Sequence, residues 1–356
     1  MTKEELAAYQ VGENLDQLMN LDPRGYGVCR VLYEGSRAFA GEPTTLHCAK
    51  GLCEAVKPGD MVLILTGFIL RPHLVPETDG IVGAILLARA LVAAFGVKPV
   101  IVCPEDNVIA VKNCAPYIGL HLYEDMKTLS AMPMAMGVIP FTKDAGQAAE
   151  QAEDILSRCL PSAVIATEAP GANLYGHYHN AVGVNCTEIE AKMDVLFEKA
   201  KELGVWNMAI GDLGNEIGMG AIAEHIREYV PYTDLGQCQC SCRGGILAKT
   251  AAQNLITATV SDWGCYGLIA AIAYLKGDIS IMHDEQMEAD VLTMAARSGM
   301  IDMTGSLLPG IDGFSLPMIT TIVRLMRQCV DYALHYENEK WFAVTLEKKY
   351  YQSRIG

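Results

Sequence analysis

The sequence has no apolar run long enough to cross a membrane and no cluster of basic residues. Its longest apolar runs, such as DMVLILTGFIL (60–70), fall short of the roughly 20 residues that a spanning helix needs. The first ten residues, MTKEELAAYQ, lack the apolar segment of a signal peptide. A formal net charge of -15 disfavours contact with a phosphate backbone. We therefore expect a soluble, cytoplasmic protein without a membrane or nucleic-acid partner.

The chain also lacks the dense cysteine spacing of a small secreted scaffold, because its 12 cysteines are scattered over 356 residues. Reduced thiols are expected. The stretch CQCSC would place Cys238, Cys240 and Cys242 on one face of a strand, but no C-x-x-C pair accompanies them. Buried or turn thiols are favoured over a metal site. His177 and His179 alternate instead of following the i, i+4 spacing of a helical zinc site, so loop hydrogen bonds are favoured for them.

Short β-branched runs alternate with longer helical patterns along most of the chain, which contains 51% hydrophobic residues. Such alternation predicts an α/β fold: a mostly parallel sheet with helices on both faces, in Rossmann-like layering. The patterns predict strands at 61–66, 98–103, 136–141, 162–167, 206–210 and 254–260, and helices at 80–96, 144–157, 187–203, from about 217, from 264, near 284–299 and at 315–336.

No repeat or low-complexity linker divides the chain. We expect one α/β domain over 30–335, a helical N-terminal arm over 1–29 and a charged C-terminal tail over 336–356. In open α/β sheets, ligands bind beyond the carboxyl ends of the strands, so an active site is expected there. Candidate site residues stand at the ends of four expected strands. They are Thr66, Gly67, Glu77, Thr78 and Asp79 after the strand at 61–66, Glu168 and Asn180 after 162–167, Asp212, Asn215 and Glu216 after 206–210, and Ser261, Asp262 and Trp263 after 254–260.

The stretch GDLGNEIGMG (211–220) places Asp212, Asn215 and Glu216 among glycines, which permit positive φ and close approach to a ligand. A binding turn is favoured, and a tight structural turn is the alternative. The pattern matches no phosphate-binding motif, so no nucleotide cofactor is expected. Carboxylates that share a pocket either acquire a raised pKa and act as acid or base, or share Mg²⁺ or Mn²⁺.

Helix capping offers a simpler role for two of these acids. Asp79 and Asp262 each stand near the start of an expected helix, and a capping Asp contributes about 1 kcal/mol. The free amides of the helix that begins near SDWG are also expected to suit an anion. Capping and ligand binding both remain open for these residues.

Taken together, the motifs resemble the D-glutamate cyclase-like family. GDLGNEIGMG resembles the family's G-D-G-G-N-E-x-G-M-G signature, and EAPGANLYGHYHN resembles its E-R-P-G-x-x-x-x-G-x-Y-x-N segment. VSDWGCYGL and RSGMIDMTGSLLPGIDGFSL resemble two further segments in the same order. The resemblance spans about residues 30–335. It implies a lyase that converts D-glutamate to 5-oxo-D-proline and water by attack of the α-amine on the γ-carboxyl.

The resemblance also implies roles for the strand-end residues. Glu168, Asp212 and Glu216 are expected to be catalytic, and Glu168 or Glu216 would accept the ammonium proton. A divalent cation, Mn²⁺ or Mg²⁺, would be held by Glu77, Asp79 and Asp212 and would polarise the γ-carboxyl. A homo-oligomer is expected. Substrate contacts are expected from Thr66, Gly67, Thr78, Asn180, Asn215, Ser261, Asp262, Trp263 and Arg297.

Four positions depart from the family pattern: Ala169 and Ala172 replace arginines, Leu213 replaces a glycine, and Asp262 replaces an asparagine. The pocket is therefore less cationic than a dicarboxylate substrate favours. Two alternatives to the cyclase stay open: a metal-assisted lyase or hydrolase acting on another small amino or carboxylic acid, and a binding protein without catalysis. Candidates to compensate for the lost charge are Arg71, Lys143, Arg243 and Arg297.

Overall fold

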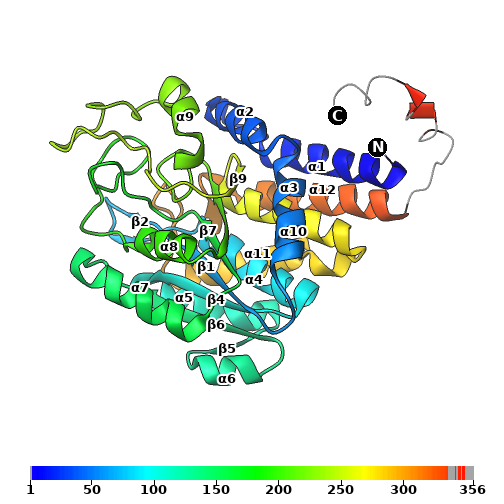
Figure 1. Cartoon of the computed structure of the whole chain (residues 1–356), viewed down its shortest axis with the longest axis horizontal. Helices are drawn as coiled ribbons and strands as arrows, with labels where there is room; N and C mark the ends of the chain where they lie inside the picture. Colours follow the sequence, from blue (N-terminus) through cyan, green and yellow to red (C-terminus); the bar gives the residue numbers. More distant parts are fainter. Residues whose placement is uncertain (1, 336–340, 342–343, 346, 349–356) are drawn as a thin grey trace.

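The computed structural model describes residues 2–335, 341, 344–345 and 347–348. A seven-stranded sheet lies at its centre, with the strand order β5-β6-β4-β1-β7-β8-β9 (Figure 1). All neighbouring strands of this sheet run parallel. Its strands are β1 (Met61–Thr66), β4 (Lys98–Pro104), β5 (His121–Tyr123), β6 (Ala135–Phe141), β7 (Ala163–Thr167), β8 (Trp206–Gly211) and β9 (Asn254–Thr257). The predicted α/β class is confirmed.

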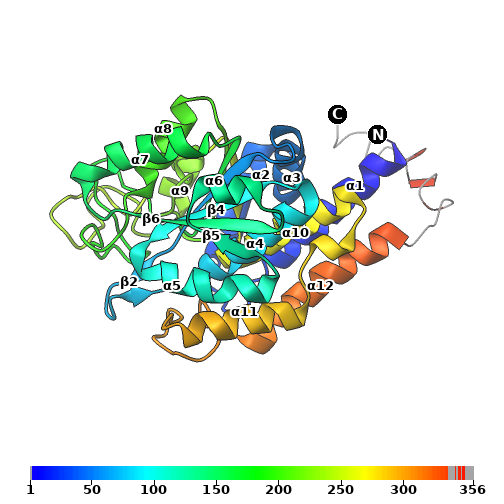
Figure 2. The same ribbon diagram turned by 90° about the horizontal axis from the view of Figure 1, so that it is seen from below.

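Helices cover both faces of the sheet, and the alternation of side chains along each strand divides the core in two. In β1, Val62 and Ile64 face one layer, whereas Leu63 and Leu65 face the other. The first layer contains α1 (Lys3–Met19), α3 (Thr44–Ala55), α4 (Ile81–Phe95), α5 (Glu105–Cys114), α10 (Ser261–Lys276), α11 (Glu285–Arg297) and α12 (Leu316–His335). The second contains α2 (Val28–Ala40), α6 (Met126–Ala131), α7 (Ala145–Cys159), α8 (Met193–Glu202) and α9 (Ala223–Tyr229). Figure 2 shows α7 and α8 on one side of the sheet and α11 on the other.

Three predicted helices start elsewhere in the structure. The helix expected at 187 begins only at Met193, because the preceding residues form turns in which buried Lys192 donates to the carbonyl of Glu190 (2.7 Å). The helix expected from about 217 is a short 3-10 turn followed by α9. The helix expected from 264 begins three residues earlier, at Ser261. Short β5, with three residues, has too little sequence pattern to be predicted.

The N-terminal helix packs against the body of the protein. Leu15 and Met19 of α1 are fully buried in the core, and the carbonyl of Met19 accepts a hydrogen bond from the backbone N–H of Thr259 (2.9 Å). Most of the predicted tail, 336–356, lies outside the described residues. The division into arm, domain and tail stays a prediction. No described helix is long and apolar enough to cross a membrane, and the cytoplasmic location stays a prediction.

Candidate active site

A cavity of about 260 Å³ lies at the carboxyl edge of the sheet. Its position follows from the topology: the chain leaves β1 toward β4 and leaves β7 toward β8, in opposite directions, so a crevice opens between the two strand ends. Phe68, Ile69 and Leu70 contribute apolar surface. The polar residues that line the cavity are Arg71, Glu77, Asp79, Glu168, Asn180, Asp212, Asn215 and Asp312.

Five of these residues carry carboxyl groups, and burial is the main reason that their pKa values rise. The pKa of Asp79 rises to about 6 and the pKa of Asp312 to about 7. For Glu77, Glu168 and Asp212, burial and the neighbouring acids raise the pKa well above the ordinary carboxyl range. Protonated and ionised carboxyl groups therefore coexist in the cavity near neutral pH.

The capping expectation for Asp79 and Asp262 needs a correction: Asp79 does accept from the N–H of Gly80 (2.9 Å) at the start of its own helix, but each carboxylate caps the helix that follows the other. Asp79 accepts from the backbone N–H groups of Asp262 (2.9 Å) and Ser261 (3.2 Å), at the start of α10. Asp262 accepts from the N–H groups of Gly80 (2.8 Å) and Gly83 (2.9 Å), at the start of α4. The α10 amides that were expected to hold an anion therefore already have a carboxylate acceptor.

The glycine-rich turn after β8 wraps around the carboxylate of Glu216. That carboxylate accepts from the backbone N–H groups of Asp212 (2.8 Å), Leu213 (2.7 Å) and Gly214 (2.6 Å). Gly218 has a φ of 99°, and a Cβ there would lie 2.2 Å from the Cβ of Ala209. Glu216 thus holds the turn in shape, while Asp212 is left with a buried Oδ1 that has no hydrogen-bond partner.

Glu168 follows β7 with a φ of 42°, a conformation that non-glycine residues seldom adopt outside functional sites. Its Oε2 accepts a hydrogen bond from Ser261 Oγ (2.5 Å), which links the end of β7 to the start of α10. A Cβ on Gly80 would lie 2.4 Å from the Cβ of Glu168, so the glycine lets α4 approach this carboxyl. Glu168 is therefore fixed between two helix N-termini.

Seven predicted substrate-binding residues do not line the cavity: Thr66, Gly67, Thr78, Ser261, Asp262, Trp263 and Arg297. Thr78 donates to the carbonyl of Gly310 (2.7 Å), and Trp263 is fully buried with its ring 4.9 Å from that of Phe314. Arg297 lies exposed at the end of α11. Thr66 is the last residue of β1, and Gly67 follows it. Asn180 and Asn215 do line it, and the Oδ1 of Asn215 has no hydrogen-bond partner.

Of the four predicted compensating cations, one lines the cavity. Arg71 stands exposed at its edge and donates to the carbonyl of Asn185. Lys143 pairs instead with Asp106 (2.6 Å) beside a different cleft. Arg243 lies exposed on the loop between α9 and β9.

Two residues of the site were not singled out from the sequence. Arg24 forms a salt bridge with Asp312, donates to the carbonyl of Thr259 (2.9 Å) and lies over the ring of Phe314 (4.8 Å). Asp312 belongs to the segment GIDGF, and this motif was the one signal for it in the sequence. In the structure, Asp312 adopts a φ of 50°. Arg24 comes from a stretch that carries no motif, and only the fold brings it here.

A possible metal-binding group occupies the centre of the cavity. Carboxylate oxygens of Asp79, Glu168 and Asp212 all lie within 4.8 Å of one another. This set shares Asp79 and Asp212 with the predicted ligands and contains Glu168 as its third member, whereas the role predicted for Glu77 stays a prediction. Oxygen ligands suit Mg²⁺ or Mn²⁺. The buried Oδ1 of Asp212 has no hydrogen-bond partner, so this oxygen is free to bind a cation.

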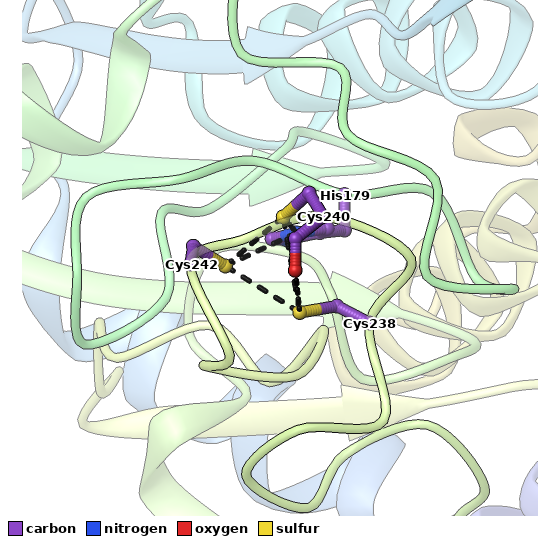
Figure 3. Close-up of side chains that lie close together, drawn as sticks. All are labelled: His179, Cys238, Cys240 and Cys242. Carbon is purple, nitrogen blue, oxygen red and sulfur yellow. Dashed lines mark hydrogen bonds between the residues drawn. The ribbon is translucent and has the colours of Figure 1, made fainter.

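The expected placement of the cysteines is wrong in one respect. Residues 238–242 form turns and no strand, and the three thiols face His179 (Figure 3). His177 makes the expected loop contact, with its Nδ1 3.2 Å from Asn185 Nδ2. The Nε2 of His179 instead lies 3.2 Å from Cys240 Sγ.

The raised carboxyl pKa values predict that the protein without divalent cations loses stability as the pH rises. A carboxyl group with a raised pKa in the folded state binds its proton more tightly there than in the unfolded chain, where the pKa of Asp is about 3.9. The contribution of such a group to the free energy of unfolding is complete below about pH 4. It is lost as the pH rises through the folded-state pKa values, which are about 6 for Asp79 and about 7 for Asp312. We expect the melting temperature of chelator-treated protein to fall between about pH 5 and about pH 8, and Mn²⁺ to raise it more at the higher pH.

Asp79→Asn, which removes one of the two carboxyl groups that titrate in this range, is expected to flatten this fall, and exposed Glu224→Gln is the matched control. A melting temperature that responds to Mn²⁺ equally at both pH values would contradict the shared carboxylate site.

The fold and the cavity define a class: an α/β protein with a small pocket, whose polar lining is mainly acidic, at the carboxyl edge of a parallel sheet. A family model described as "D-glutamate cyclase-like, C-terminal" matches residues 15–327. This chain belongs to the D-glutamate cyclase-like family.

A comparison with curated proteins agrees with the family assignment. The human protein named D-glutamate cyclase, mitochondrial, is 24% identical to this chain over 361 aligned positions. The alignment covers 92% of this chain and 52% of the human protein. The chain therefore spans about half the length of that relative.

Proposed function

We propose that this chain is a D-glutamate cyclase-like lyase that converts D-glutamate to 5-oxo-D-proline and water. The observation that carries the proposal is the group of Asp79, Glu168 and Asp212, all with raised pKa values, in one small cavity. The cavity of about 260 Å³ lies below the usual range for drug-sized ligands, about 300–1,000 Å³, and suits a single amino acid.

The reaction needs one group that takes a proton and another that gives one. The α-nitrogen forms a bond to the carboxyl carbon of the γ-carboxyl group (Cδ), a bond from that carbon to oxygen breaks, and two protons that leave the ammonium end on the departing oxygen as water. Asp79, with a pKa of about 6, is largely ionised at neutral pH and serves as the base. Asp212 and Glu168, whose pKa values are raised further by burial and neighbouring acids, supply the proton to the leaving oxygen.

The remaining polar groups orient the substrate. Arg71, the cationic side chain among the described lining residues, pairs with one substrate carboxylate at the edge of the cavity. Asn215 Oδ1, buried and unpartnered, accepts from the substrate ammonium. When Asp79, Glu168 and Asp212 are all ionised, they would instead hold a divalent cation, which would take the place of their protons, offset the negative charge and polarise the γ-carboxyl. Glu216 positions the turn, since its carboxylate oxygens already accept three backbone N–H groups.

A second candidate is the same chemistry on a different small amino or carboxylic acid. Ala169 and Ala172, at the family's arginine positions, are buried and do not line the cavity. A single guanidinium at the edge favours a substrate with one free carboxylate over a dicarboxylate.

Purified protein is expected to form 5-oxoproline from D-glutamate and not from L-glutamate. Product is measured by chiral chromatography, with added Mn²⁺ or Mg²⁺ and with chelator. D-selective product supports the cyclase. Absence of product from D-glutamate, together with turnover or thermal stabilisation by another small acid, would replace it with the second candidate.

A further inference from the structure

A cluster of four side chains joins two loops outside the acidic cavity. His179 lies between β7 and α8, whereas Cys238, Cys240 and Cys242 lie between α9 and β9. Their ligand atoms all lie within 4.8 Å of one another, and Figure 3 shows the sulfurs gathered around the imidazole. We propose that these four side chains bind one zinc ion, in a site separate from the acidic cavity.

The distances between the ligand atoms match a tetrahedral site. Cys240 Sγ lies 3.2 Å from Cys242 Sγ and 3.8 Å from Cys238 Sγ, and the latter two sulfurs are 3.5 Å apart. His179 Nε2 lies 3.2 Å from Cys240 Sγ and 3.6 Å from Cys242 Sγ. Zinc bonds of about 2.3 Å to sulfur and about 2.0 Å to nitrogen separate tetrahedral ligands by about 3.5–3.8 Å. Each of these five separations is within about half an ångström of that range.

Neither a disulfide nor ordinary hydrogen bonding explains this arrangement. All three cysteines are free, and their sulfurs are much farther apart than the roughly 2.05 Å of a disulfide. Thiols are weak donors and acceptors, so three of them gain little by facing one imidazole. Cys242 Sγ also accepts from the N–H of Gly244 (3.4 Å) and from Asn173 Nδ2 (3.5 Å), as a thiolate ligand would.

Local backbone geometry lets the C-x-C-x-C spacing replace the usual C-x-x-C pair. Gly236, Arg243 and Gly245 have φ values of 91°, 60° and 69°, so the loop turns back on itself around the sulfurs. His179 completes the set from 61 residues before Cys240. Three thiolates with one imidazole select zinc over the hard cations that suit the acidic cavity.

A metal at this place would fasten the segment 168–192, which lines part of the cavity, to the segment 230–253. The segments 168–192 and 230–253 contain no helix, and Gln239 N–H donates to the carbonyl of Gly183 (2.8 Å) between them. Asn180, the neighbour of His179, lines the cavity, and the His179 carbonyl accepts from Asn215 Nδ2 (3.0 Å). Because all four ligands come from the protein, the site is structural, with no open position for substrate.

The test is the metal content of the full chain, purified without a metal-affinity column and dialysed. Elemental mass spectrometry is expected to find about one zinc ion per chain. Exchange of zinc for Co²⁺ is expected to give the visible bands of tetrahedral cobalt together with thiolate-to-cobalt charge transfer in the near ultraviolet. Titration of the folded wild type with a mercurial is expected to release the zinc as three thiols react.

Variants separate this site from the acidic cavity. Cys240→Ser and His179→Ala are expected to retain less than about a fifth of the zinc, whereas the matched controls Cys53→Ser and Cys329→Ser keep it. Asp212→Asn is expected to keep the zinc as well. Each variant is checked by circular dichroism.

Three results would overturn the proposal: wild-type protein that holds no zinc and gives no cobalt–thiolate spectrum, zinc that is lost from Asp212→Asn and kept by Cys240→Ser, or a disulfide among the three cysteines in freshly purified protein. None of these readouts depends on turnover, so the outcome is independent of the proposed lyase activity.

Discussion

Asp212→Asn is expected to lower kcat for 5-oxoproline formation by about 10²–10⁴-fold, the range for loss of a general acid or base. Asp212 combines a buried, unpartnered Oδ1 with a pKa that burial and Glu168 raise well above the ordinary range. Asparagine keeps the shape of the protonated side chain and cannot donate its proton in the same way. The fold should survive, because no side-chain hydrogen bond of Asp212 is broken.

The measurement is a comparison of kcat and KM with exposed Glu224→Gln as the control, and of melting temperatures for both variants. A variant that keeps wild-type kcat would remove Asp212 from the catalytic groups. A loss of kcat accompanied by unfolding would instead assign Asp212 to the fold.

Glu216→Ala is expected to destabilise the protein by about 3–6 kcal/mol, because it leaves three backbone N–H groups in a buried turn without their acceptor. Each unsatisfied buried donor costs about 1–3 kcal/mol, and a domain has only about 5–15 kcal/mol in total. Urea unfolding followed by circular dichroism measures the change.

Glu216→Gln makes the matched comparison, since one amide oxygen has two lone pairs for three donors and the amide N–H₂ repels them. We expect an intermediate loss, with Glu224→Ala unchanged within about 0.5 kcal/mol. If Glu216→Ala were as stable as wild type but inactive, the sequence prediction of a catalytic Glu216 would replace the positioning role.

The strand positions were readable from the sequence because a buried parallel strand needs a short, continuous apolar run, as in MVLILT. Likewise, α4 ends where Gly96 adopts a φ of 67°, a conformation that glycine supplies without strain. These features depend on near neighbours in the chain. The placement of Asp79, Glu168 and Asp212 at strand ends followed from the same patterns and from the geometry of parallel sheets.

The identity of each partner depended on contacts that no local pattern encodes. Sequence logic assigned Asp79 and Asp262 to cap their own helices, but the N-termini of α4 and α10 meet, so each acid caps the other's helix. The pairing of Arg24 with Asp312 could not be predicted for the same reason, because the two residues lie 288 positions apart in the sequence.

The sequence by itself determined the layered α/β fold, the edge of the sheet where acids gather and the resemblance to the D-glutamate cyclase-like family. Only the tertiary structure decided which acids share a centre, that Glu216 supports its own turn, and that His179 meets three cysteines. Periodicity and turn chemistry are fixed by residues a few positions apart. Burial, pKa shifts and ligand sets are fixed by loops that converge from distant strands, which spacing alone cannot bring together.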